Sequence, residues 1–127
     1  MKTAEDIESF LIQMDTPFET MGPGLWRLKE VGPDLVLTLA DSVLAFRLKL
    51  MDAKDVPAPK REALYRRLLE LNASEMLHGA FGLEANSVVV TAALQLENLD
   101  LNELQATLDD IGMAASDHYT AISQFVA

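Results

Sequence analysis

In residues 43–51, apolar and charged side chains alternate. The apolar positions are Leu44, Phe46, Leu48 and Leu50, and the charged positions are Arg47 and Lys49. Successive side chains of a β-strand point to opposite faces, so this pattern predicts a strand with one buried face and one face in water. A sheet with one wet face is typical of antiparallel proteins. The segment therefore favours an antiparallel sheet that is covered on one side.

Turn residues divide the neighbouring sequence into further short strands. Strands are predicted over residues 25–31 and 35–40, with Gly32, Pro33 and Asp34 as the turn between them and a two-residue connection at 41–42. With residues 43–51 they form a three-stranded meander. A second pair is predicted over 80–83 and 88–96, joined by a turn at 84–87. Both faces of the last strand are apolar or weakly polar, so it can be covered on both sides.

Three helices are predicted around these strands. The first begins at Thr3, an N-cap residue with Asp6 in the first turn, and ends before Pro17. The second starts near Pro59 and ends at His78 and Gly79, where glycine would be the C-terminal cap and His78 would face the helix dipole. The third starts at Asp100 and Glu103. Its apolar stripe is Leu101, Leu104, Leu108, Ile111, Ala115, His118, Ile122 and Phe125, which predicts one long helix.

The order of elements gives an α+β fold, α-β-β-β-α-β-β-α, in which an antiparallel sheet packs against helices. No repeat, low-complexity tract or boundary interrupts it, so we expect a single domain over residues 1–127, an ordinary size for one domain.

Charge is distributed unevenly along the chain. The last basic residue is Arg67, whereas acidic residues continue to Asp117, and the net charge is −10. Such a chain repels phosphate, which argues against nucleic-acid binding and anionic membranes. Cysteine is absent, no apolar run approaches the roughly 18–20 residues of a membrane span, and the first eight residues contain three acids. We expect a soluble, cytoplasmic protein without membrane insertion.

No motif indicates catalysis or a cofactor. His78 and His118 are far apart in sequence and fit no metal-ligand spacing, and His118 falls on the apolar stripe as a core or interface residue. Adjacent residues on a helix diverge, so the sequence Ser116-Asp117-His118 forms no triad. Asp109 and Asp110 are expected on the solvated face of the last helix. We therefore predict no catalytic residue, no metal, no cofactor and no enzyme.

Several runs together resemble a known superfamily. They are residues 64–73, which end a helix in an L-x-x-N pattern, residues 79–83 and 88–94 of the predicted hairpin, and the leucine-plus-acidic step at 96–100. These features resemble the Tir-chaperone-like superfamily, which contains type III secretion chaperones and YbjN-like proteins. The resemblance implies a small acidic homodimer that lacks an active site. Its subunits would meet through the second helix and adjacent strands, and apolar grooves and a sheet edge would hold an extended client segment.

The resemblance directs two sets of site predictions. The candidates for client binding are Ile7, Phe10, Leu11, Met14, Trp26 and Leu28, although each could simply cover the sheet. The candidates for the dimer interface are Leu64, Tyr65, Leu68, Leu69, Val89, Thr91 and Ala93. A basic cluster at residues 60–67 is either a solvated face or an inter-subunit partner of the acidic half.

Three functions remain open from the sequence. The first is a non-enzymatic homodimeric chaperone that keeps a client, such as a secreted effector, soluble and competent for secretion. The second is a YbjN-like regulatory or structural domain that binds a folded partner and has no secretion client. The third, an enzyme or ligand-binding domain, would require convergent polar groups around a pocket.

Overall fold

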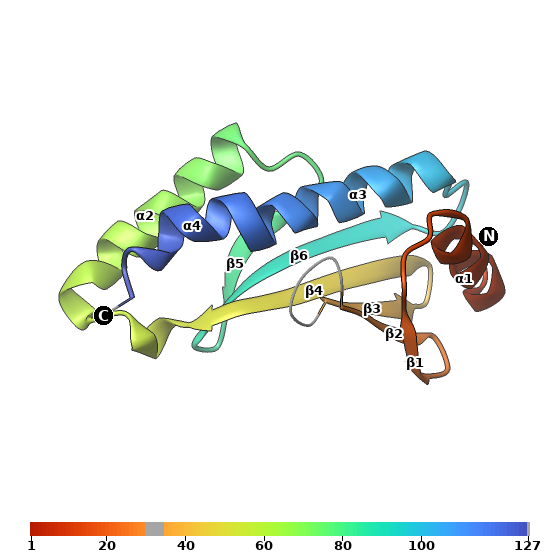
Figure 1. Cartoon of the computed structure of the whole chain (residues 1–127), viewed down its shortest axis with the longest axis horizontal. Helices are drawn as coiled ribbons and strands as arrows, with labels where there is room; N and C mark the ends of the chain where they lie inside the picture. Colours follow the sequence, from red (N-terminus) through yellow and green to blue (C-terminus); the bar gives the residue numbers. More distant parts are fainter. Residues whose placement is uncertain (30–34, 127) are drawn as a thin grey trace.

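The computed structural model describes residues 1–29 and 35–126, and their central feature is a six-stranded antiparallel sheet (Figure 1). Its spatial order is β1-β2-β3-β4-β6-β5, so β1 and β5 are the edges. The strands are β1 (Glu19–Gly22), β2 (Leu25–Leu28), β3 (Leu35–Ala40), β4 (Val43–Asp52), β5 (Ala80–Glu84) and β6 (Ser87–Gln95). The predicted α+β class and antiparallel sheet are confirmed.

The first strand was absent from the sequence prediction. The segment Glu19–Gly22 lacks apolar alternation, and pairing with β2 supports it instead: Glu19 lies opposite Arg27 and Thr20 opposite Trp26. Gly24 turns the chain between the strands with φ of +65°, a conformation that glycine adopts without strain. The meander therefore has four strands, not three. The predicted turn at 32–34 lies outside the described residues, and β2 ends at Leu28.

The predicted alternation in β4 is wrong at Leu50 because the strand contains a β-bulge. Lys49 lies opposite Val89 but Met51 lies opposite Val88, so Leu50 is the extra residue between them. A bulge reverses the alternation beyond it. Met51 is therefore buried in the core, and Leu50, which was predicted to point inward, is only half-buried.

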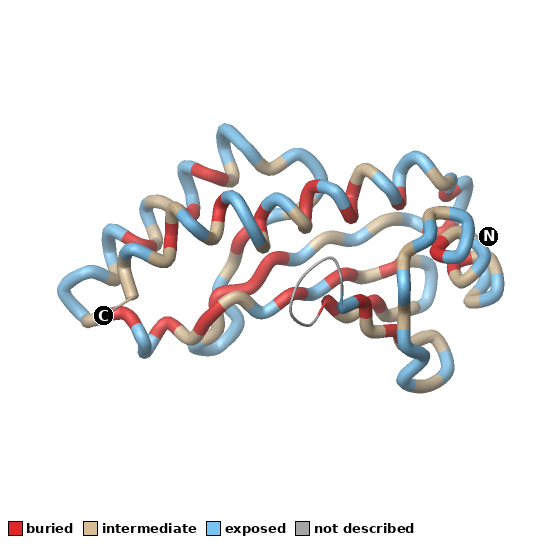
Figure 2. The backbone as a smooth tube through the Cα atoms, viewed as in Figure 1, coloured by how far each residue is buried: buried red, intermediate tan, exposed pale blue. Residues whose placement is uncertain are grey.

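The helices are α1 (Ala4–Gln13), α2 (Ala58–Ser74), α3 (Leu101–Met113) and α4 (Tyr119–Ser123). A 3-10 turn, η1 (Ala53–Asp55), leads into α2. Figure 1 shows that α3 and α4 run along the sheet and that α2 lies beside α4. The first helix, α1, lies at the end of the sheet where α3 begins, near β1 and β2. In Figure 2 the buried positions of these helices and the strands form one interior, to which Trp26, Phe46, Leu64 and Ile111 belong.

Two helix predictions need correction. The last helix is not uniform, because the π-helical segment η2 (Ala114–His118) separates α3 from α4; the apolar stripe runs through it unbroken and gave no sign of it. The second helix ends at Ser74, so Gly79 is not its C-terminal cap and His78 lies in the loop to β5.

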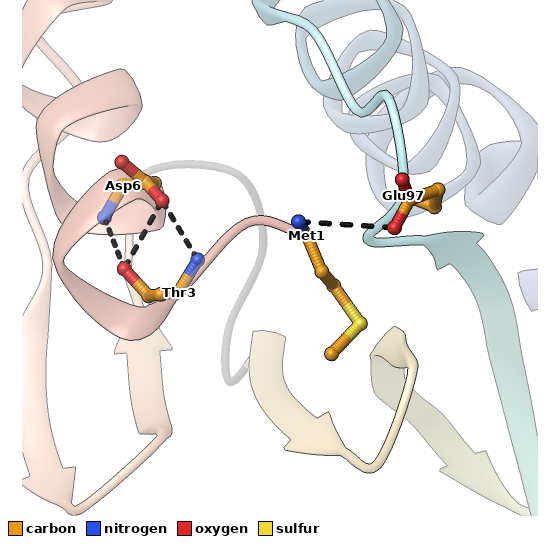
Figure 3. Close-up of polar contacts among 4 residues, drawn as sticks. All are labelled: Met1, Thr3, Asp6 and Glu97. Carbon is orange, nitrogen blue, oxygen red and sulfur yellow. Dashed lines mark hydrogen bonds and ion pairs between the residues drawn. The ribbon is translucent and has the colours of Figure 1, made fainter.

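The predicted helix starts are confirmed. The Thr3 side chain accepts the N–H of Asp6, while the Asp6 carboxylate accepts the N–H of Thr3 at 2.8 Å (Figure 3). Asp100 likewise accepts the N–H of Glu103 at 2.8 Å. The N-terminal amino group forms an ion pair with Glu97 at 3.7 Å (Figure 3). The N–H of Lys2 donates to the carbonyl of Leu96. These contacts place α1 against the connection between β6 and α3.

Candidate functional site

Among the surface hollows of the described residues, two are lined in part by predicted site residues and lie toward opposite ends of the sheet. The first, which we call the α1–β1 hollow, has a volume of about 440 Å³ and is lined by Leu11, Ile12, Asp15, Thr16, Pro17 and Phe18. The second, the α2–β5 groove, has a volume of about 270 Å³. It is lined by Tyr65, Leu68, Leu69, Asn72, Phe81, Gly82 and Leu83.

The α1–β1 hollow lies between α1 and the connection that leads into the edge strand β1. Ile12, at the rim of the hollow, is 65% exposed, and Phe18 is half-buried. Met21, which follows in β1, is 47% exposed. Single exposed apolar side chains are ordinary on a protein surface, but an apolar side chain that lines a hollow, as Ile12 does, can mark a binding site. The sequence prediction included Leu11 of this lining but missed Ile12 and Phe18. The available signal was Ile12, an apolar residue that lies off the α1 stripe.

The predicted client-binding residues fall into two groups. Ile7, Leu11, Trp26 and Leu28 are core residues with at most 1% exposure. Phe10 and Met14 are half-buried and pack against the same core. The structure thus brings all six to the α1 end of the sheet, but only Phe10 and Met14 offer appreciable surface. The other four form the floor beneath it.

The predicted dimer residues are not one patch. Leu64 is buried in the core. Tyr65, Leu68 and Leu69 line the α2–β5 groove, where Leu68 is buried at the floor and Leu69 is 69% exposed. Thr91 and Ala93 are exposed on the uncovered face of the sheet, where Thr91 lies opposite Arg47 and Ala93 opposite Ala45. Val89 belongs to the same face by register but is buried. The strand β5 lies between the two groups.

Ion pairs surround the uncovered face. Arg27 donates to the Glu19 carboxylate at 2.9 Å, and this hydrogen bond holds the pKa of Glu19 below its ordinary value. The Arg47 guanidinium bonds Glu84 and lowers the pKa of that carboxyl, while its own pKa rises in return. These carboxyls sit on the two edge strands, β1 and β5. Both pairs are partly exposed, so their contribution to stability is small.

One buried acid overturns a sequence prediction. Asp110 was expected on the solvated face, but it is only 7% exposed. Its carboxylate accepts the backbone N–H groups of Leu77, His78 and Gly79, the last two at 2.9 and 2.8 Å. The residue therefore anchors the loop between α2 and β5 to α3. Its partners lie more than thirty residues away in sequence, so no local pattern could indicate them.

The two histidines do not converge. His78 is exposed in the loop before β5, and its backbone N–H bonds Asp110. His118 is buried, as its place on the apolar stripe predicted, and packs against Phe81. Across residues 1–29 and 35–126, no group of three or more acidic or histidine side chains is suited to holding a metal ion.

The family model described as CesT_Tir_1 matches residues 1–127, the whole chain. The chain belongs to the CesT_Tir_1 family. This confirms the superfamily resemblance that the L-x-x-N helix end and the following hairpin indicated. Comparison with curated protein sequences returns no match.

Solved structures share the fold of this CesT_Tir_1 member. YbjN from E. coli, described as a candidate transcription regulator, superimposes with a TM-score of 0.68 at 15% identity, covering 97% of this chain and 94% of YbjN. A chain of the ExoU–SpcU complex from the type III secretion system of Pseudomonas aeruginosa gives a TM-score of 0.70 at 18% identity, with 94% and 97% covered. A structure of the Yersinia pestis secretion chaperone SycH with a fragment of YscM2 gives 0.59 at 15% identity, with 91% and 95% covered. At these identities the likeness concerns the fold.

Among the helices of the described residues, none has the length and apolar character that a membrane crossing requires.

Proposed function

We propose that this protein is a non-enzymatic, homodimeric, cytoplasmic chaperone of the type III secretion type, which binds an extended segment of a client and keeps it soluble. The observation that carries the proposal is the α1–β1 hollow beside an edge strand. Family membership supports it, as do the complexes in which ExoU is bound to SpcU and SycH to a fragment of YscM2. The whole of residues 1–127 acts as one domain in this proposal.

The α1–β1 hollow suits an extended client because strand addition and side-chain pockets act together. An added strand pairs its backbone with a free edge, and every second side chain can enter an adjacent hollow. Here β1 supplies the edge and Ile12, Phe18 and Met21 supply apolar contacts. Phe10 and Met14 extend this surface, while Ile7, Leu11, Trp26 and Leu28 support it from the core.

The α2–β5 groove is proposed as the contact between subunits. Tyr65 and Leu69 project at its rim above the buried Leu64 and Leu68, and an aromatic beside an exposed leucine is suited to an isologous contact. Val89, Thr91 and Ala93 would complete the interface where the partner extends around β5. Two copies would carry a charge of −20, twice the −10 of one chain, which favours cationic or amphipathic clients and keeps exposed apolar surface in solution.

A YbjN-like regulatory or structural role is the alternative, and the likeness to YbjN over nearly all of both chains favours it. In that role the same surfaces would bind a folded partner and no secretion client. Fold alone does not separate these roles.

Purification of the tagged protein from its native host tests the proposal. We expect a stoichiometric client with the wild type. Recovery should fall strongly with Ile12→Lys, which places a charge in the α1–β1 hollow, and with Met21→Lys, which places a charge on the exposed part of β1. Leu77→Lys is the matched control, since Leu77 is 84% exposed but lies outside both hollows. An extended client should be protected from proteolysis only in the segment that is bound. A partner that resists proteolysis along its whole length even after separation from this protein would indicate a folded partner instead. Recovery of no stoichiometric partner contradicts the chaperone function.

A further inference from the structure

The two edge strands of the sheet, β1 and β5, differ in whether their outward-facing backbone N–H and C=O groups already have hydrogen-bond partners. In an antiparallel pair, the N–H and C=O of one residue point to the partner strand and those of the next residue point away. Phe81 of β5 directs both groups to the side chain of Asn72. The Asn72 amide oxygen accepts the Phe81 N–H at 2.7 Å, and its NH₂ group donates to the Phe81 carbonyl at 3.1 Å. These groups therefore face away from β6, on the outer edge of the sheet.

The same alternation applies on either side of Phe81. Gly79 precedes it by two residues, and its N–H is taken by Asp110 at 2.8 Å. Leu83 follows Phe81 by two residues, so its N–H and carbonyl also point away from β6. Within the described part of β5, these two groups have no hydrogen-bond partner. Beyond it, Glu84 already pairs with Ser87 at the hairpin turn. One free residue is too short a template for another strand.

We propose that Asn72 and Asp110 close the β5 edge against strand addition, so that an extended partner chain pairs with the sheet at β1. Edge strands are templates for pairing unless something blocks them. Side chains from α2 and α3 block β5 here, whereas β1 hydrogen-bonds only to β2 among the described residues. A second copy at the α2–β5 groove would consequently pack through side chains and would not continue the sheet.

This inference rests on the proposed binding of extended clients, yet it is testable without a natural client. The probe is a synthetic heptapeptide of alternating threonine and valine with a lysine at each end. Its residues favour strands, and its charge complements the acidic protein. Amide hydrogen exchange, resolved by residue with NMR, reports which edge it occupies. For the wild type we expect at least tenfold slower exchange at β1 on peptide addition and no change at Leu83.

Asn72→Leu removes both hydrogen bonds and should extend the peptide-induced slowing to Phe81 and Leu83. Ala73→Leu is the matched control, because it adds the same apolar side chain to an exposed position of α2 and leaves Asn72 intact. Asn72→Asp keeps an acceptor for the Phe81 N–H but frees its carbonyl, and should give an intermediate effect if Asn72→Leu does not fold.

The proposal is overturned if the peptide slows amide exchange at Leu83 in the wild type. It is also overturned if the peptide slows no amide exchange in β5 of either Asn72 variant. If the wild type binds the peptide at neither edge but still co-purifies with its client, the proposed preference for the β1 edge is contradicted. The proposed chaperone function is then unaffected. If the peptide slows amide exchange at β1 alone and no client co-purifies, the preference for the β1 edge is supported and the chaperone function is contradicted.

Discussion

The imidazole of His118 stands edge-on against the ring of Phe81, with centroids 6.3 Å apart and planes inclined by 69°. This contact joins the π-helical segment η2 to the edge strand β5. The Nε2 atom of His118 is buried and has no hydrogen-bond partner among the described residues. The histidine therefore acts here as an aromatic core residue, and its polar atom adds a cost that its packing offsets.

Replacing Phe81 and His118 should separate packing from polarity. Phe81→Ala removes a buried ring and should lower the free energy of unfolding by about 3–4 kcal/mol. His118→Phe keeps a ring of similar size and removes the unpartnered nitrogen, so the free energy should stay within about 1 kcal/mol of the wild type or rise. Urea denaturation at pH 7 measures both. A loss of several kcal/mol for His118→Phe would show that Nε2 has a partner in solution.

The buried carboxylate of Asp110 should contribute far more than its exposed neighbour. Asp110→Ala leaves three N–H groups of residues 77–79 without their acceptor and should lower the free energy of unfolding by about 2–3 kcal/mol, because hydrogen bonds to charged groups are strong. Asp109→Ala is the matched control and should change it by about 0.5 kcal/mol or less. Chemical denaturation of both variants checks this, and equal effects would contradict the anchoring role.

A charge in the α2–β5 groove should dissociate the proposed dimer. Leu69→Lys would place an ammonium against the partner subunit, and burial of an unpaired charge is costly. Light scattering should give twice the chain mass of 14.0 kDa for the wild type and a single chain mass for this variant. Leu77→Lys should remain dimeric. A wild type that is monomeric at tens of micromolar contradicts the homodimer, and a dimeric Leu69→Lys places the interface elsewhere.

The capping box of α1 should make stability depend on acidic pH. The hydrogen bond from the Thr3 backbone N–H lowers the pKa of the Asp6 carboxyl below the ordinary value for an aspartate. A lowered pKa in the folded state stabilises the protein above the unfolded-state pKa, and this stabilisation is lost as the pH falls through the folded value. At neutral pH Asp6→Asn should therefore be less stable than the wild type, and the difference should shrink below about pH 4.

Glu5→Gln controls for this measurement, because it removes a negative charge from the same helical turn without breaking the capping box. Thermal denaturation across the acidic range should show a smaller pH-dependent difference for this variant. A gap between wild type and Asp6→Asn that does not change with pH would rule out the ionised carboxylate as its cause.

Local patterns were sufficient where a segment's own residues decide its structure. The alternation in β4 predicted the sheet, and the caps at Thr3 and Asp100 predicted where α1 and α3 begin. The apolar stripe placed His118 inside. The L-x-x-N pattern, which ends in Asn72, contributed to the family resemblance that the whole-chain match confirmed.

The tertiary structure decided what depends on distant partners. Glu19–Gly22 is a strand because β2 lies beside it, and Leu50 leaves the alternation because β6 accommodates a bulge. Asp110 is buried because a loop 31–33 residues away presents three donors to it. Asn72 shows the division in one residue. Its identity contributed to the resemblance, but only the folded chain brings its amide to the edge of β5. Hydrogen-bond partners of this kind are brought together by the fold and leave no periodic pattern in the sequence.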